Sequence, residues 1–495
     1  GGENGWANER MLDIDQINSW YNHKKSPLCN TITCEFSRYE NPSSTTAGAQ
    51  LFNNPHGGSI DMITTAREVY ISSGASFNTL LISNVLEFNN VYNYTISQAL
   101  AVTKNSNASY TQRFFISFFG DPAMHLPISK PNIKITTMNN TPVSQSLDTI
   151  KALSHNYFKG VVTDANDNLL PNFNGELFVE VFDKSVTLQT LNNDNSFFNG
   201  VPAIMDFDTR QSKIFNGKAS VVNGLWEFDF IAPRDIRIAY GNAKISFYTD
   251  NNIIDKMGYN TDIIIGGINE NAPADTIGPK INLYMNDESF IDGGNTNQSP
   301  LFLAILEDES GINTSTTAVD HDIIAILDGD VSNPINMNNY YETELNDFTK
   351  GKVKYPFRDL AVGHHTISFK AWDTYNNMSE ATLNFVVVSD ENLVLDHVLN
   401  YPNPFINYTE FWFNHNKPNE ALDVQVQIFT ISGKLIKTIN QNILTEGTLS
   451  RSITWNGLDD FGNKIGKGVY IYKLNVKVNS SNIRKEKFEK LVILQ

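Results

Sequence analysis

The chain contains little cysteine, fewer basic than acidic residues and no long apolar run, and each shortage excludes a class of protein. Two cysteines among 495 residues cannot build a disulfide framework, and neither has the CxxC or Cys/His spacing of a zinc site. The 37 lysines and arginines stand against 54 aspartates and glutamates, and the net charge of −17 argues against nucleic acid or an anionic membrane as a direct partner. No run approaches the roughly 18 apolar residues of a membrane span.

The first 127 residues have the pattern of an α/β domain. Residues 12–21 have helical spacing, and the β-branched runs at 28–34 and 59–66 are typical of strands. Alternation of strands and helices predicts a parallel sheet. We therefore predict an α/β fold for residues 1–127.

The rest of the chain is predicted to be all-β. Short alternating stretches such as 177–182, 225–230 and 244–248 are separated by Gly, Asn and Asp turns, which is the pattern of a β-sandwich. We predict immunoglobulin-like sandwich domains, with Trp455 and Tyr470 in the core of the last one. The predicted domains are 1–127, 128–268, 279–392 and 398–495, with a linker at 269–279.

Cys34 is the candidate nucleophile. It ends the predicted strand 28–34, and reactive groups of a parallel sheet gather where strands end. A nucleophilic cysteine must be a thiolate, which a neighbouring histidine promotes by taking the proton. The alternative is a buried structural cysteine, which is common for a free thiol. Cys29 lies five residues away, so on one strand the two would face opposite sides and could not bridge easily.

The polar residues around this cysteine have competing interpretations. Glu35 and Arg38 flank the thiol and are candidates for substrate contact, but a surface salt bridge explains them equally well. His23 lies in a polar turn and His56 in an Asn-Pro-His-Gly-Gly turn, so each is better explained as a surface or turn residue than as the base.

A calcium site is a weaker hypothesis, built on acidic residues in the third predicted domain. Their spacing fails the EF-hand template, although Asp328-Gly329-Asp330 has a composition seen in calcium loops. Acids of turns are the favoured interpretation, so we expect no cofactor and no metal. The residues concerned are Asp308, Asp320, Asp322, Asp328 and Asp330.

Four segments of the first domain resemble the gingipain-type C25 cysteine peptidases, which have a caspase-like fold. They are, in order, GGENGWANERMLDIDQINSW, TITCEFSRYENP, NPHGGSIDMITTAREVY and FFGDPAMHLP. The resemblance implies a Cys-His dyad with Cys34 as nucleophile, and an oxyanion hole formed by the backbone N–H groups of Gly1 and Cys34. It places the histidine immediately before Gly1. We therefore expect this chain by itself to lack the catalytic histidine and to be inactive.

The resemblance continues to the C-terminus and is most specific for the surface signal peptidases, or sortases, of the type IX secretion system of Bacteroidetes. The tail from Tyr401-Pro-Asn-Pro-Phe405 onward resembles the FlgD-like immunoglobulin-type domain of that system. What this implies is a cell-surface enzyme at the outer membrane that cuts C-terminal signal domains from cargo. It would link cargo to anionic lipopolysaccharide, and its C-terminal domain would bind the shuttle protein PorV. The alternatives are a non-catalytic scaffold docked on the shuttle protein, and a secreted gingipain-like protease.

Overall fold

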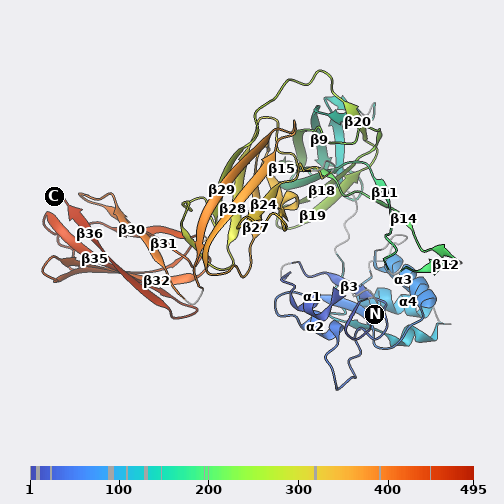
Figure 1. Cartoon of the computed structure of the whole chain (residues 1–495), viewed down its shortest axis with the longest axis horizontal. Helices are drawn as coiled ribbons and strands as arrows, with labels where there is room; N and C mark the ends of the chain where they lie inside the picture. Colours follow the sequence, from blue (N-terminus) through green and yellow to red (C-terminus); the bar gives the residue numbers. More distant parts are fainter. Residues whose placement is uncertain are drawn as a thin grey trace. The chain divides into compact units, whose positions relative to one another are not determined.

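The computed structural model divides into two compact units, which Figure 1 shows in sequence colours. The first unit holds Gly1–Ser129 and Thr190–Met205, and the second holds Lys130–Gln189 and Asp206–Gln495. Within the described residues, no helix is both long and apolar enough to cross a membrane. The described residues are 2–6, 12–22, 25–86, 94–106, 110–126, 132–145, 148–193, 195–198, 200–316, 320–389, 392–445 and 447–494.

The first unit is built around a three-stranded sheet in the order β3-β4-β5. Strands β3 and β4 run parallel, as predicted, but β5 is antiparallel to β4, so the expectation of a wholly parallel sheet is wrong for that strand. The elements are β1 (Gly5–Trp6), β2 (Leu12–Asp13), α1 (Ile14–Asn18), β3 (Leu28–Thr31), α2 (Ala47–Asn53), β4 (Asp61–Thr65), α3 (Ile71–Val85), α4 (Ile96–Ser106), the 3₁₀ helix η1 (Thr111–Phe115) and β5 (Ile116–Phe119).

Helices cover both faces of this sheet. Because side chains alternate along a strand, neighbouring residues of β4 serve two cores. Ile63 packs with α3 and α4, and Met62 packs with α1 and α2. The predicted helix 12–21 is shorter than expected, since residues 12–13 pair with β1 and Asp13 caps α1.

The second module follows as a β-sandwich whose core draws on an eight-stranded and a three-stranded sheet. The predicted strands 177–182, 225–230 and 244–248 lie within β10, β16 and β18. The strands are β6 (Ile133–Met138), β7 (Thr141–Pro142), β8 (Thr149–Ala152), β9 (His155–Val162), β10 (Gly175–Phe182), β11 (Val186–Gln189), β14 (Asp206–Thr209), β15 (Lys213–Val222), β16 (Leu225–Ile231), β17 (Gly241–Asn242), β18 (Lys244–Asp250), β19 (Asp255–Asn260) and β20 (Ile264–Ile268). The short strands β12 (Phe197–Phe198) and β13 (Val201–Pro202) pair with each other in the segment Thr190–Met205, which belongs to the first unit.

The third module is a sandwich of two sheets, ordered β21-β23-β27-β26 and β22-β29-β28-β24-β25, around a separate apolar core. Its elements are β21 (Lys280–Met285), β22 (Asn295–Thr296), β23 (Leu301–Glu307), β24 (Ile324–Leu327), β25 (Ile335–Asn336), the 3₁₀ helix η2 (Asn338–Tyr340), β26 (Tyr341–Glu344), β27 (Asp347–Pro356), β28 (Gly363–Trp372) and β29 (Met378–Val387).

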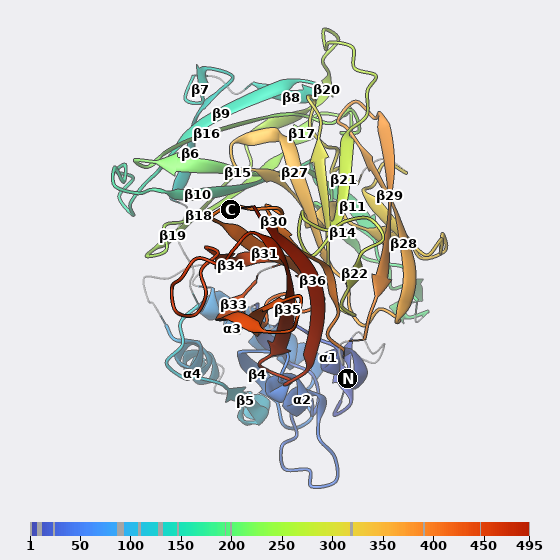
Figure 2. The ribbon, with the colours of Figure 1, turned by 90° about the vertical axis from the view of Figure 1, so that its left-hand side faces the viewer.

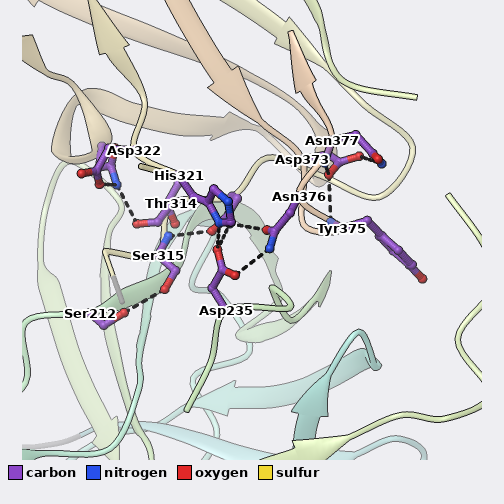
Figure 3. Close-up of polar contacts among 12 residues, drawn as sticks. Ser212, Asp235, Thr314, Ser315, His321, Asp322, Asp373, Tyr375, Asn376 and Asn377 are labelled. Carbon is purple, nitrogen blue, oxygen red and sulfur yellow. Dashed lines mark hydrogen bonds and ion pairs between the residues drawn. The ribbon is translucent and has the colours of Figure 1, made fainter. Parts of the chain in front are cut away.

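A buried carboxylate joins the second and third modules. The side chain of Asp235, in the loop after β16, is 7% exposed. Its two oxygens accept hydrogen bonds from Asn313 Nδ2 at 2.8 Å, His321 Nδ1 at 2.8 Å and Asn376 Nδ2 at 2.7 Å, all from the third module (Figure 3). A buried carboxylate with three donors is well satisfied, so this joint holds the two modules in a fixed relation.

The C-terminal module is a further sandwich, ordered β30-β31-β34 and β33-β32-β35-β36, and its strands β35 and β36 are red in Figure 2. The predicted core position of Trp455 is confirmed, and Tyr470 packs half-buried against the same core. The strands are β30 (Leu395–Tyr401), β31 (Thr409–His415), β32 (Ala421–Thr430), β33 (Leu435–Leu444), β34 (Leu449–Trp455), β35 (Gly468–Val478) and β36 (Arg484–Ile493). The predicted fold class, an α/β portion followed by β-sandwiches, is confirmed.

Candidate functional site

Cys34 lies at the edge of the sheet where the parallel strands β3 and β4 end. The strand stops at Thr31, three residues earlier than predicted, so Cys34 stands in the loop beyond it. Its side chain is half-buried, and Sγ donates a hydrogen bond to the Val69 carbonyl at 3.5 Å. Parallel strands present their carboxyl ends at one edge, where loops position reactive groups. The thiol therefore has the position expected of a nucleophile.

The loop that carries the thiol is fixed by buried hydroxyl groups. Thr64 Oγ1 of β4 contacts both Thr31 Oγ1 at 2.9 Å and Ser37 Oγ at 3.0 Å, while Ser37 N donates to the Thr65 carbonyl at 3.0 Å. Gly48 of α2 packs against this turn so closely that a Cβ there would lie 1.9 Å from Ser37 Oγ. Hydrogen bonds and packing thus hold the backbone around Cys34 in place.

The two cysteines have different surroundings. Cys29 lies inside β3, and burial raises the pKa of its thiol, although a hydrogen bond with Ser59 opposes the shift. A raised pKa keeps a thiol protonated and unreactive. Cys29 therefore fits the structural role, and Cys34, in a loop at the strand ends, fits the reactive one. Both are free thiols.

Tyr110 is a neighbour of Cys34 that sequence reasoning missed. It caps η1 and packs against Phe77 with ring centroids 6.0 Å apart. Burial raises the pKa of Tyr110, and the charge of Cys34 raises it further. The hydroxyl is buried without a hydrogen-bond partner among the described residues. Tyr110 is 76 positions beyond Cys34 in the sequence, so no local pattern connects them.

His56 lies at the wrong end of the sheet to serve Cys34. It is exposed in the turn before β4 and stacks on Tyr21 with centroids 4.8 Å apart. Cys34 instead follows the carboxyl end of β3, beside the end of β4, and five strand residues span roughly 16 Å. The interpretation of His56 as a turn residue is therefore supported. His23 and Gly1, the other predicted base candidate and the oxyanion-hole residue, lie outside the described residues.

Arg38 binds both Glu35 and the N-terminal segment. Arg38 Nη1 lies 3.2 Å from both Glu35 Oε1 and Glu3 Oε1. Ser44 and Asn41 donate to the other Glu3 oxygen, and these hydrogen bonds lower the pKa of Glu3. The salt bridge allowed by the sequence is thus present. It ties the segment beginning at Gly2 to the cysteine loop, while substrate contact by Glu35 and Arg38 stays a prediction.

Three carboxylates converge, and only one of them, Asp308, is among the acids that the sequence suggested. Asp373 also lies in the third module, whereas Asp275 lies in the linker before it. Oxygens of Asp275, Asp308 and Asp373 lie within 4.8 Å of one another, which is a spacing that could hold a divalent cation. Burial raises the pKa of Asp308 to about 6 and also raises the pKa of Asp373. Asp330, by contrast, accepts hydrogen bonds from Ser332, as an acid of a turn does.

The first 127 residues match a known protein family. Residues 1–127 match the model of peptidase family C25. This segment contains the sheet, the cysteine loop and the buried hydroxyl groups described above. The match agrees with the resemblance to the C25 peptidases that was drawn from the motifs.

The chain is also similar to a protein of known structure. The chain is similar to dimeric latent PorU from Porphyromonas gingivalis, with 26% identity, coverage of 88% of this chain and 41% of that chain, and a TM-score of 0.35. It thus spans less than half the length of that protein.

Two sets of β-sandwich modules are also similar. They are the Clostridium thermocellum CbhA fibronectin(III)-like modules (7% identity, 43% and 93% coverage, TM-score 0.18) and the chicken CNTN1 FN1-FN3 domains (9% identity, 74% and 99% coverage, TM-score 0.18). Among curated proteins, none matches the chain.

Proposed function

We propose that the chain is part of a cell-surface cysteine endopeptidase and transpeptidase, a sortase of the type IX secretion system. The observation that carries the proposal is the position of Cys34, in a fixed loop at the strand ends of a segment that matches the model of family C25. The sequence resemblance to type IX sortases supplies the finer assignment. On this proposal the substrates are the C-terminal signal domains of exported cargo.

The reaction follows the chemistry of a thiol nucleophile. The Cys34 thiolate attacks the scissile carbonyl, and the thiol proton passes through the base to the departing amine of the signal domain. The resulting thioester is then attacked by an amine of surface lipopolysaccharide, which forms an amide, or by water, which releases a carboxylate. The base would be the family histidine that the resemblance places immediately before Gly1.

The remaining modules would serve attachment. The C-terminal module, 398–495, would bind the outer-membrane shuttle protein PorV and keep the enzyme at the cell surface. The support for this proposal is the resemblance of the tail to the FlgD-like domain, together with its sandwich fold. In a secreted protease of the gingipain type, by contrast, this module would be removed.

The test compares Cys34→Ala with Cys29→Ala in the full-length protein, expressed in cells that export type IX cargo. Cys29 lies in the same sheet, so its substitution controls for loss of a thiol. Intact masses of surface and medium proteins report whether cargo keeps its C-terminal domain. We expect uncut cargo only with Cys34→Ala. Normal removal of the cargo's C-terminal domain in both variants would favour the alternative of a non-catalytic scaffold. Loss of residues 398–495 from the protein itself would favour the alternative of a secreted protease.

A further inference from the structure

The large sheet of the second module splits between two consecutive strands. Strands β15 and β16 are joined by a two-residue turn, Asn223-Gly224, in which both residues have positive φ (53° and 76°). Such a turn begins a hairpin. Yet only two pairs form, Val221 with Trp226 and Val222 with Leu225. Beyond them β15 continues along β10, and β16 continues along β9.

The third module occupies the edge that β15 would have offered to β16. Lys218 N donates to Thr343 Oγ1 at 3.2 Å, and Asn346 N donates to the Lys218 carbonyl at 3.0 Å. Ser220 N donates to Asn346 Oδ1 at 2.7 Å. In a regular hairpin the Ser220 N–H would donate to the backbone carbonyl of Glu227. Asn346 therefore takes the place of β16 as the hydrogen-bond partner of β15 at this position.

The corresponding edge of β16 is left open. Val162 N donates to the Gly224 carbonyl and Ala232 N to the Ser154 carbonyl, which shows that the even-numbered residues of β16 turn their backbone groups toward β9. The odd-numbered residues of β16 therefore turn their backbone N–H and C=O groups away from β9, toward the side of β15. In the part of the chain that the structure describes, the N–H groups of Glu227 and Asp229 find no backbone acceptor on that side.

A cavity of about 700 Å³ lies along this open edge. Figure 2 labels β9, β16 and β15 of the second module and β27 of the third in this part of the molecule. Phe215, Trp226 and Phe228 line the cavity from the second module, and Phe348 lines it from the third. Trp226 is 3% exposed, and its indole N–H has no hydrogen-bond partner among the described residues. The size is that of a ligand site, and the lining combines apolar rings with unused donors.

The charged side chains at the rim already have partners within the chain. Lys218 Nζ lies 2.7 Å from Glu342 Oε2, and Asp347 Oδ1 accepts hydrogen bonds from Thr349 N and Oγ1. Lys159 Nζ lies 3.0 Å from Glu227 Oε2, and His155 Nε2 lies 2.6 Å from Asp229 Oδ2. Paired charges offer little attraction to an ionic ligand, so the cavity favours an uncharged occupant. The open backbone groups recur at every second residue, which matches the spacing of an added strand.

We propose that this cavity binds an extended, uncharged peptide segment, which adds to the open edge of β16 and places an aromatic or branched apolar side chain against Trp226 and Phe228. The joint at Asp235 keeps the second and third modules in register, so the site is formed before the peptide arrives (Figure 3). Main-chain hydrogen bonds supply affinity in this mode of recognition, and the ring-lined cavity supplies selectivity. The proposal does not depend on peptidase activity.

The test measures binding of a fluorescein-labelled probe, acetyl-Thr-Val-Phe-Val-Thr-amide, to the 495-residue chain by fluorescence anisotropy. The decisive variants are Asp229→Pro and Asp229→Ala. Both remove the ion pair with His155, but only proline removes the N–H that faces the cavity, and the ladder with β9 does not use that N–H. We expect Asp229→Ala to bind, and Asp229→Pro to bind at least tenfold more weakly.

A second measurement keeps the test independent of folding in the proline variant. A probe N-methylated on the phenylalanine and on the valine that follows it loses an N–H on each of its two edges, so it cannot pair fully through either edge, and we expect it to bind the wild-type chain at least tenfold more weakly than the parent. Equal binding of the two probes would overturn strand addition. Absence of binding to the parent probe, or its displacement by the neutral oligosaccharide maltoheptaose, would overturn the assignment to peptide.

Discussion

Protonation of His415 should destabilise the C-terminal module at mildly acidic pH. The imidazole is 3% exposed, at the end of β31. Nδ1 accepts from Lys417 N at 3.2 Å, so the neutral ring carries its proton on Nε2 and donates it to Thr445 Oγ1 at 2.8 Å. Burial lowers the pKa of His415 from 6.5 to about 4. A second proton would have to enter a buried nitrogen that already serves as an acceptor.

The size of the effect follows from linkage. Because the folded pKa lies below the unfolded one, the unfolded chain binds more protons between pH 6.5 and 4, and stability is lost as the pH falls through that window. The folded and unfolded pKa values of His415 differ by about 2.5, which corresponds to about 3.4 kcal/mol of unfolding free energy. About 2 kcal/mol of this free energy is lost by pH 5.

The assay is urea unfolding at pH 7.5, 6 and 5, followed by pulse proteolysis with mass spectrometry of peptides from 398–495. His415→Gln keeps a donor near Thr445 and cannot titrate, so its stability should change with pH by about 2 kcal/mol less than that of the wild type. His397→Gln, an exposed histidine of the same module, is the control and should retain the wild-type slope. Equal slopes for His415→Gln and wild type would refute the argument.

Two further predictions concern the third module and the cysteine loop. Asp308 has a folded pKa of about 6, raised by burial from 3.8, so the third module should gain about 2.4 kcal/mol between pH 7 and pH 4, the opposite sign to His415. Asp308→Asn should remove that dependence and raise the melting temperature at pH 7 in calorimetry, whereas a lower melting temperature would indicate that the carboxylates bind a cation. Gly48→Ala should displace the loop of Cys34 at a cost of about 1–3 kcal/mol. We expect a changed rate of Cys34 alkylation in that variant, and Gly466→Ala, where a Cβ meets nothing within 4 Å, is its control.

The sequence was informative wherever the signal is local. Alternating apolar residues predicted the strands at 177–182, 225–230 and 244–248, because side chains of a strand alternate between core and solvent. The position of Cys34 at a strand end also followed from its β-branched neighbours. The motifs around that cysteine identified the C25 segment, which the family match confirms.

Strand partners were beyond sequence reasoning. The apolar pattern of β5 is the same for a parallel or an antiparallel neighbour, so its direction could not be predicted. For the same reason, the sequence of residues 213–231 does not predict that β15 and β16 separate after two residue pairs. A strand's period fixes its faces, but the choice of partner belongs to the packing of distant segments.

What the sequence by itself determined is therefore the fold class, the positions of several strands and the cysteine that carries the proposed chemistry. Only the tertiary structure brought Asp275, Asp308 and Asp373 together, placed Tyr110 beside Cys34, and opened the edge of β16 against the third module. The physical reason is distance along the chain. Periodicity and turn chemistry act over a few residues, whereas these groups meet only after separate strands and modules have packed.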